Sequence, residues 1–155
     1  MSQQIPLSSD AEIGVGRPHH LHEVAADLAY KRLTLVNVIF VGLPGSPDWV
    51  LVDTGIPGSA QAIVEAAASR FGEGIAPRCI VMTHGHFDHA GSLEALARIW
   101  PVPIYAHRLE HPYLNGTAAY PPPDPSVGGG LMALRGATLD KWSMPPERPT
   151  LWSKI

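Results

Sequence analysis

The sequence has few charged residues and only one cysteine. Asp, Glu, Lys and Arg make up 16% of its 155 residues, and the formal net charge is −3. Domains that bind nucleic acids show a basic patch or stripe, so we expect no nucleic-acid partner. The single thiol, Cys79, cannot form a disulfide within the chain. This fits a reducing compartment, and we interpret Cys79 as a small, buried apolar residue.

Long apolar runs are also absent. The longest apolar stretch, residues 33–43, is interrupted by Thr34, Asn37 and Gly42. It is far shorter than the ~20 residues that a membrane-spanning helix needs, so we expect no membrane association. The first ten residues show neither the basic nor the apolar region of a signal peptide. These absences together predict a soluble, cytoplasmic protein.

Apolar residues make up 45% of the chain, which is enough to form the core of one domain. One or two short edge strands are expected before residue 33. Runs of β-branched and apolar residues predict four further strands, at 33–41, 49–52, 79–82 and 101–107. Apolar residues at helical spacing predict two helices, one capped by Ser59 and one beginning near Gly91. This alternation of strands and helices is typical of an α/β domain.

The last third of the chain differs in composition. From Pro112 onward it contains "YPPPDPSVGGG", which is incompatible with regular structure because proline removes backbone donors and ordered glycine is entropically costly. After Ala133 no periodicity of either kind is visible. We therefore predict one domain over residues 1–133 and a divergent, loosely ordered tail over 134–155.

The segment "THGHFDHAG" holds four potential metal ligands in six consecutive residues: His84, His86, Asp88 and His89. In extended backbone, side chains two residues apart point the same way, as expected for the first two histidines. The aspartate and the last histidine follow as the chain turns into a helix. An isolated histidine pair is usually a solvated loop, but four such side chains after a buried strand predict a metal site. This ligand mix accepts zinc, iron or manganese.

The motif H-x-H-x-D-H, together with "LVDTG" upstream, resembles the signature of the metallo-β-lactamase superfamily over about residues 33–133. The resemblance implies the N-terminal half of an αββα sandwich, in which a mixed β-sheet has helices on one face. It also implies one or two Zn²⁺ ions at one edge of the sheet. By position, His84 and His86 would bind the first ion, and Asp88 and His89 the second. Asp53 would support the site without binding metal; as an alternative, it is a turn residue before glycine.

The activity implied by the resemblance is zinc-dependent hydrolysis of a small-molecule substrate. A metal-bound hydroxide, oriented by the catalytic residue Asp88, would attack an ester, lactone, thioester or phosphodiester. A diiron electron-transfer module is a further alternative, but such relatives carry glutamate where this chain has His86.

The chain also departs from the family. The remaining metal ligands of family members lie downstream, whereas after Ala133 this chain has no histidine and only one aspartate, Asp140. A truncation or a frameshift of the gene would produce this pattern. The alternative function is therefore an inactive half-domain that binds metal weakly or not at all, so whether the chain is an enzyme stays open. The uncovered sheet of a half-sandwich would favour a homo-oligomer.

The remaining histidines are expected outside the site. We expect His107 to make a structural hydrogen bond, and His19, His20 and His22 to be solvated. Tyr120, in the proline- and glycine-rich segment, is a candidate for shaping substrate access, because long loops often carry specificity.

Overall fold

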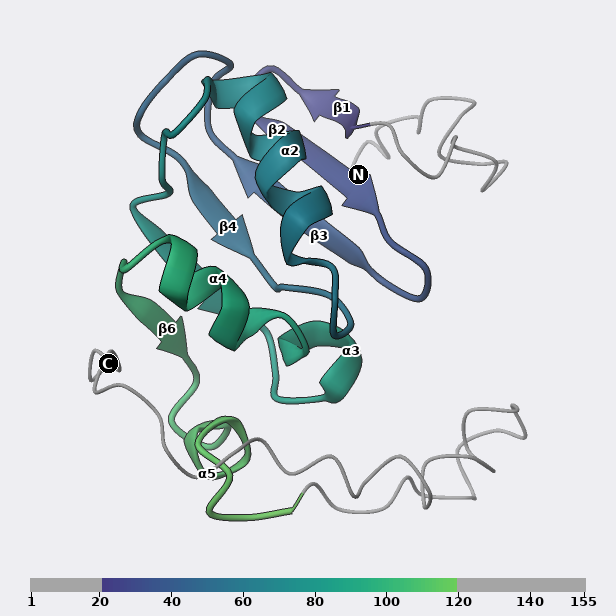
Figure 1. Cartoon of the computed structure of the whole chain (residues 1–155), viewed down its shortest axis with the longest axis vertical. Coiled ribbons are helices and arrows are strands. Elements are labelled where there is room, and N and C mark those ends of the chain that lie inside the picture. The colour runs from purple at the N-terminus through teal and green to yellow at the C-terminus, as the bar shows by residue number, and fades with distance from the viewer. Residues whose placement is uncertain (1–20, 120–155) are drawn as a thin grey trace, which may run out of the picture.

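The described part of the chain, residues 21–119 of a computed structural model, is built on a six-stranded mixed sheet (Figure 1). The strands lie side by side in chain order, from β1 at one edge to β6 at the other. Their bounds are β1 Leu21–Ala25, β2 Leu28–Arg32, β3 Asn37–Val41, β4 Val50–Val52, β5 Cys79–Met82 and β6 Ile104–Ala106. The predicted tail 134–155, Tyr120, His19 and His20 all lie outside the described residues.

Pairing changes from antiparallel to parallel at β4. The pairs from β1 to β4 are antiparallel, and β4–β5 and β5–β6 are parallel. Parallel neighbours need a crossover, and helices α2 (Ala60–Phe71) and α4 (Leu93–Ile99) provide the two crossovers here. Both helices lie on the same face of the sheet (Figure 1). The prediction of an α/β fold with a mixed sheet and helices on one face is confirmed. No helix within residues 21–119 is long and apolar enough to cross a lipid bilayer.

Two predicted elements differ in their bounds. The strand expected from residue 33 begins only at Asn37, because the N–H of Leu33 donates to the carbonyl of Val36 at 2.8 Å and closes a turn there. The helix expected to begin near Gly91 begins at Leu93 as α4, and a separate short helix, α3 (Phe87–Ala90), precedes it. The Gly91 N–H donates to the carbonyl of Gly55 at 2.8 Å, a residue outside the helix, and the helical hydrogen bonding is interrupted.

Ser59 stands at the N-cap of α2, as predicted, but its side chain makes no capping hydrogen bond. Its backbone N–H instead donates to the Ser92 hydroxyl at 2.9 Å, a contact from the other crossover. A short helix, α5 (His111–Leu114), also forms where no helix was predicted. Pro112 is compatible with it because proline is tolerated in the first helical turn.

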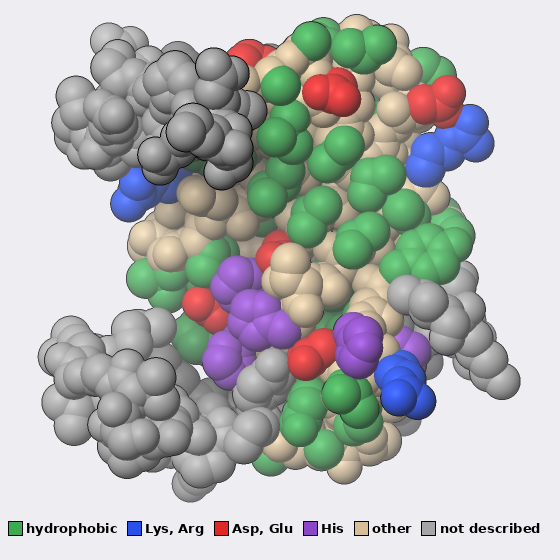
Figure 2. Space-filling model, turned by 180° about the vertical axis from the view of Figure 1, so that it is seen from behind, with side chains coloured by type: hydrophobic (Ala, Val, Ile, Leu, Met, Phe, Trp, Pro, Cys, Tyr) green, Lys and Arg blue, Asp and Glu red, His purple; other side chains and the backbone are tan. Residues whose placement is uncertain are grey.

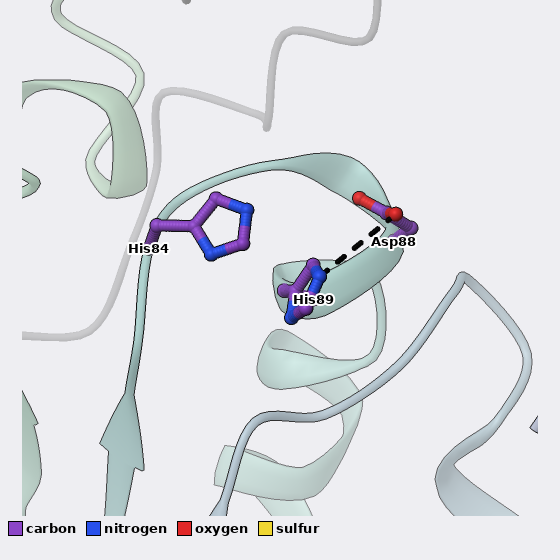
Figure 3. A group of neighbouring side chains, drawn as sticks. All are labelled: His84, Asp88 and His89. Atoms are coloured by element: carbon purple, nitrogen blue, oxygen red, sulfur yellow. Dashed lines mark ion pairs between the residues drawn. The ribbon is translucent and has the colours of Figure 1, made fainter. Parts of the chain in front are cut away.

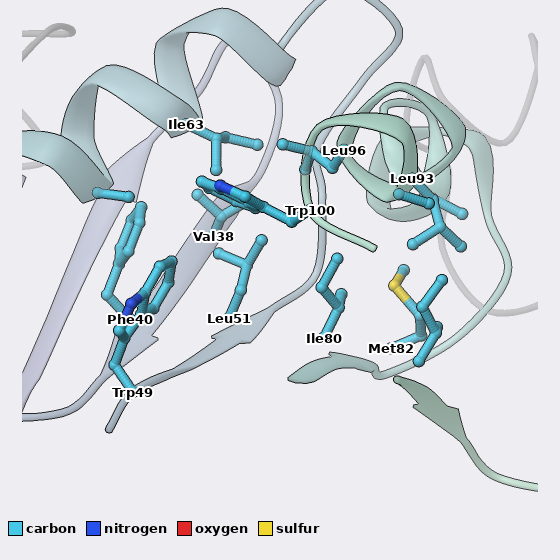
Figure 4. Packing of buried hydrophobic residues seen from close by; sticks show 14 of the residues in the cluster. Val38, Phe40, Trp49, Leu51, Ile63, Ile80, Met82, Leu93, Leu96 and Trp100 are labelled. Atoms are coloured by element: carbon cyan, nitrogen blue, oxygen red, sulfur yellow. The ribbon is translucent and has the colours of Figure 1, made fainter. Parts of the chain in front are cut away.

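The core lies between the sheet and the two crossover helices (Figure 4). Phe40 and Leu51 from the sheet and Ile63 from α2 are fully buried. The Trp49 ring stacks on Phe71 at 4.4 Å between centroids, and it meets Trp100 edge-on at 5.6 Å. Such aromatic pairs add about 0.5–1.5 kcal/mol beyond their buried area, so these contacts help hold both helices on the sheet.

The opposite face of the sheet carries apolar side chains that stay partly exposed (Figure 2). Alternation along the strands places them opposite the core residues. The residues of this open face are Ile39, Val41, Val50, Val52, Cys79, Val81 and Tyr105. Cross-strand pairs such as Ile39 with Val52 make the apolar surface continuous. The position of Cys79 here corrects its predicted burial, because its neighbour Ile80 occupies the core side of β5.

His22 also differs from its prediction. It was expected to be solvated, but its ring stacks on Tyr30 with 4.8 Å between centroids. The two residues are opposite each other in the β1–β2 pairing, so the antiparallel register brings the rings together.

Candidate metal centre

The site forms where β4 and β5 end. These strands are parallel neighbours, so their carboxyl ends meet at the same edge of the sheet. Asp53 follows β4 and Thr83 follows β5, and the N–H of Asp53 donates to the carbonyl of Val81 at 2.9 Å. The histidine loop, residues 83–86, then leads directly into α3.

Three of the four predicted ligands form a compact group (Figure 3). One potential ligand atom each from His84, Asp88 and His89 lies within 4.8 Å of the others. The ring centroids of the two histidines are 4.1 Å apart, and His89 Nε2 lies 3.9 Å from Asp88 Oδ2. His84 reaches the group from the loop, whereas the other two side chains come from α3. All three are partly buried.

His86 borders this group without belonging to it. Its ring centroid lies 4.8 Å from that of His84, as expected for side chains two residues apart in extended backbone. The residue is exposed and occupies the N-cap position of α3, with φ −62° and ψ 149°. The structure thus places the fourth predicted ligand beside the other three, on the solvent side.

Asp53 is buried next to the group, and its carboxylate accepts three hydrogen bonds. Oδ1 accepts the Thr83 N–H at 2.8 Å, and Oδ2 accepts the Thr83 hydroxyl at 2.7 Å. Oδ2 also lies 2.8 Å from His89 Nδ1. Asp53 has φ 61°, a left-handed conformation that is uncommon outside glycine and recurs at functional sites. Asp53 was predicted from the sequence, whereas Thr83 was noted only as part of the motif.

Thr54, the residue after Asp53, connects the loop after β4 to α3 by hydrogen bonds. The N–H and the hydroxyl of Thr54 both donate to the carbonyl of His89, at 2.7 and 2.8 Å. At Gly91, an added Cβ would lie 2.4 Å from the backbone nitrogen of Pro57 and from the carbonyl oxygen of Phe87. Only glycine therefore allows this close approach of the two segments.

A second support for the histidine loop comes from α5. Glu110, just before this helix, accepts the Gly85 N–H through Oε2 at 3.0 Å. A Cβ added at Gly85 would lie 3.0 Å from the Cβ of Tyr113, so glycine also lets α5 pack closely against the loop. Sequence reasoning missed Glu110, because its distance of 25 residues from Gly85 leaves no local signal.

The surroundings of His84 favour its neutral form. Burial, followed by the positive charges that His89 and His86 would carry, lowers the pKa of His84 from the ordinary value of 6.5. The neutral imidazole is the form that binds metal. His107 lies outside the group: it is exposed, and its Nδ1 accepts the Leu109 N–H at 3.3 Å. This is a local structural hydrogen bond of the kind predicted for it.

Residues 32–150 match the sequence pattern of the Metallo-beta-lactamase superfamily. The chain is also similar to the "Probable metallo-hydrolase YflN" of Bacillus subtilis (strain 168), with 47% identity over 112 residues, or 72% of this chain and 42% of that protein. A "Hydroxyacylglutathione hydrolase" of Anaeromyxobacter dehalogenans (strain 2CP-C) is 35% identical over 99 residues, which cover 60% of this chain and 34% of that protein.

The fold is similar to that of MEM-A1, a subclass B3 metallo-β-lactamase isolated from a soil metagenome library. The TM-score is 0.61 at 22% identity, and the match covers 89% of this chain and 46% of that one. The chain thus spans less than half the length of each of these relatives. From the extent of the sequence match and the shared fold, the chain belongs to the metallo-β-lactamase superfamily of metallo-hydrolases.

Proposed function

We propose that His84, Asp88 and His89, with His86 beside them, bind one or two divalent metal ions, zinc foremost, and that this site serves hydrolysis. The compact donor group supports the proposal most directly, because all three ligand atoms lie within 4.8 Å of one another. Two imidazoles and a carboxylate are a donor set that zinc accepts, and iron or manganese accept it as well. The substrate class that we propose is a small molecule with an ester, lactone, thioester or phosphodiester bond.

The roles of the residues follow from their chemistry. A bound divalent metal would supply a lowered water pKa and polarisation of the reacting carbonyl or phosphoryl oxygen. His84 and His89 bind through neutral imidazole nitrogens, which the low pKa of His84 favours. Asp88 would accept a hydrogen bond from the nucleophile and so orient it. Asp53 holds the ring of His89 at Nδ1, so Nε2 would be the nitrogen that binds the metal.

The second candidate is a domain that binds metal weakly and has no activity of its own. The small number of donors favours it, since the described residues bring only three side chains into the compact group. The match covers 42% of the probable metallo-hydrolase YflN. In this second candidate, the further metal donors of a complete hydrolase site would have to come from outside this chain.

Metal titration separates the two candidates. We expect the metal-free chain to bind zinc, and His84→Ala and His89→Ala each to weaken binding at least tenfold. His107→Ala is the matched control, because this histidine lies outside the group and should leave binding unchanged. Ester and lactone hydrolysis that rises with zinc occupancy and disappears in Asp88→Ala supports the enzyme. Weak or absent zinc binding without hydrolysis supports the second candidate, and measurable but equal affinity in all variants contradicts the proposed site.

A further inference from the structure

The hydroxyl of Thr83 lies between the buried carboxylate of Asp53 and the ring of His84. Its oxygen is 2.7 Å from Asp53 Oδ2 and 3.0 Å from His84 Nδ1. The same carboxylate oxygen lies 2.8 Å from His89 Nδ1. One carboxylate therefore reaches both histidines of the compact group, directly in one case and through a hydroxyl in the other.

The directions of these hydrogen bonds follow from counting protons. A carboxylate has no proton to donate, so Asp53 accepts from both neighbours. The Thr83 hydroxyl has a single proton, and it donates this proton in its hydrogen bond to Asp53. Toward His84 the hydroxyl can only accept, and the ring must carry its proton on Nδ1. His89 likewise donates its Nδ1 proton to Asp53, so Nε2 is the unprotonated nitrogen of both neutral rings.

We infer that Thr83 is a positioning residue that transmits the orientation of the Asp53 carboxylate to His84, so that one carboxylate sets the tautomer of both histidines and presents Nε2 of each to the metal. This inference rests on the proposed function where it concerns the metal. The tautomers themselves are a property of the metal-free protein.

A purely structural role for Thr83 would depend on its backbone and not on its hydroxyl. Its backbone N–H also donates to Asp53 Oδ1 at 2.8 Å, and this contact fixes the start of the histidine loop. Thr83→Val keeps that backbone contact and the shape of the side chain, and it removes only the hydroxyl. Thr83→Ser keeps the hydroxyl and is the matched rescue variant.

The first test is the tautomer of each ring in the full, metal-free chain, from long-range ¹H–¹⁵N NMR correlations at a pH well above the ordinary histidine pKa. In the unaltered protein we expect the proton on Nδ1 for His84 and His89. His107 is an internal reference of opposite form, because its Nδ1 accepts a hydrogen bond and its proton is therefore on Nε2. A proton on Nε2 of His84 in the unaltered protein overturns the inference without any variant.

The variants then isolate the hydroxyl. Thr83→Val should release His84 to a mixture of tautomers, while His89 keeps its proton on Nδ1 through Asp53. Thr83→Ser should behave like the unaltered protein. If His84 keeps its Nδ1 proton in a folded Thr83→Val protein, Thr83 does not position the ring.

Zinc titration gives the second readout. Partners that orient metal ligands are typically worth about 10–100-fold in metal affinity, so we expect a loss of about tenfold in Thr83→Val and little change in Thr83→Ser. Equal losses in both variants contradict a role for the hydroxyl. If the unaltered protein shows the expected tautomers but binds no zinc, the proposed function fails while the positioning by Thr83 stands.

Discussion

The N–H of Gly85 donates a 3.0 Å hydrogen bond to Oε2 of Glu110, which ties the histidine loop to the beginning of α5. We expect Glu110→Ala to weaken zinc binding about tenfold, because the loop that carries His84 loses an orienting contact. Glu110→Gln should restore most of the affinity, since its amide oxygen also accepts a hydrogen bond. Isothermal titration calorimetry of the metal-free proteins with zinc measures both effects. Glu94→Ala, which removes an exposed pair with Arg98 on α4, is the control. Unchanged affinity in Glu110→Ala would show that α5 does not support the loop.

At Gly91 we expect a steric effect on stability. Gly91→Ala places a Cβ 2.4 Å from backbone and ring atoms of Pro57, and the two segments must separate. Overpacking of this kind costs about 1–3 kcal/mol, and we expect the upper part of this range from urea unfolding. Gly58→Ala is the comparison, because an added Cβ there meets open space and only the positive φ of 89° is unfavourable. A smaller loss at Gly91 than at Gly58 would mean that the loop around Pro57 moves aside easily.

The lowered pKa of His84 predicts how the metal-free protein responds to acid. Protonation of His84 is less favourable in the folded state than in the unfolded state, so the unfolded chain binds more protons below pH 6.5, the ordinary value. The stability that the neutral ring contributes is complete above that pH. It is lost as the pH falls through the lower folded-state pKa. NMR titration of the His84 ring should show a midpoint below 6.5, and His84→Gln should flatten the dependence of unfolding free energy on pH in this range. A midpoint above 6.5 would contradict the prediction.

The open face of the sheet predicts self-association. Its apolar residues are continuous across β3, β4 and β5, and contiguous exposed apolar surface favours contact with another protein surface. We expect sedimentation velocity to show concentration-dependent oligomers. Ile39→Lys and Val52→Lys, which pair across β3 and β4, should shift the chain toward monomer. Gln61→Lys adds the same charge at an exposed position of α2 and should leave the oligomeric state unchanged. A monomer at every concentration in the unaltered protein would contradict this expectation.

The sequence was sufficient where the determinants are local. β5 and the histidine loop were predicted within a residue, because a short apolar run followed by four potential ligands is a dense pattern in a few positions. The apolar spacing likewise predicted the helix α2, in which Ile63 and Phe71 are buried. That the sheet is mixed was implied only by the family resemblance.

What the sequence did not reveal depends on contacts between distant segments. The Gly91 N–H donates to the carbonyl of Gly55, and the Ser59 N–H donates to the hydroxyl of Ser92 on the other crossover. The link from Thr83 to Asp53 spans 30 residues. Periodicity and propensity describe neighbours along the chain, so they contain no information about such pairs.

The change from antiparallel to parallel pairing at β4 divides the sheet into two parts that can change separately in evolution. The hydrogen bonds that orient the histidines, as described above, all connect residues between 53 and 110, on the parallel side. The meander from β1 to β3 supplies packing and a hydrophobic surface. Recombination that exchanged the meander would therefore leave the metal-orienting segment intact as one contiguous unit, and substitutions in β1 to β3 would alter the stability of the domain before they altered its chemistry.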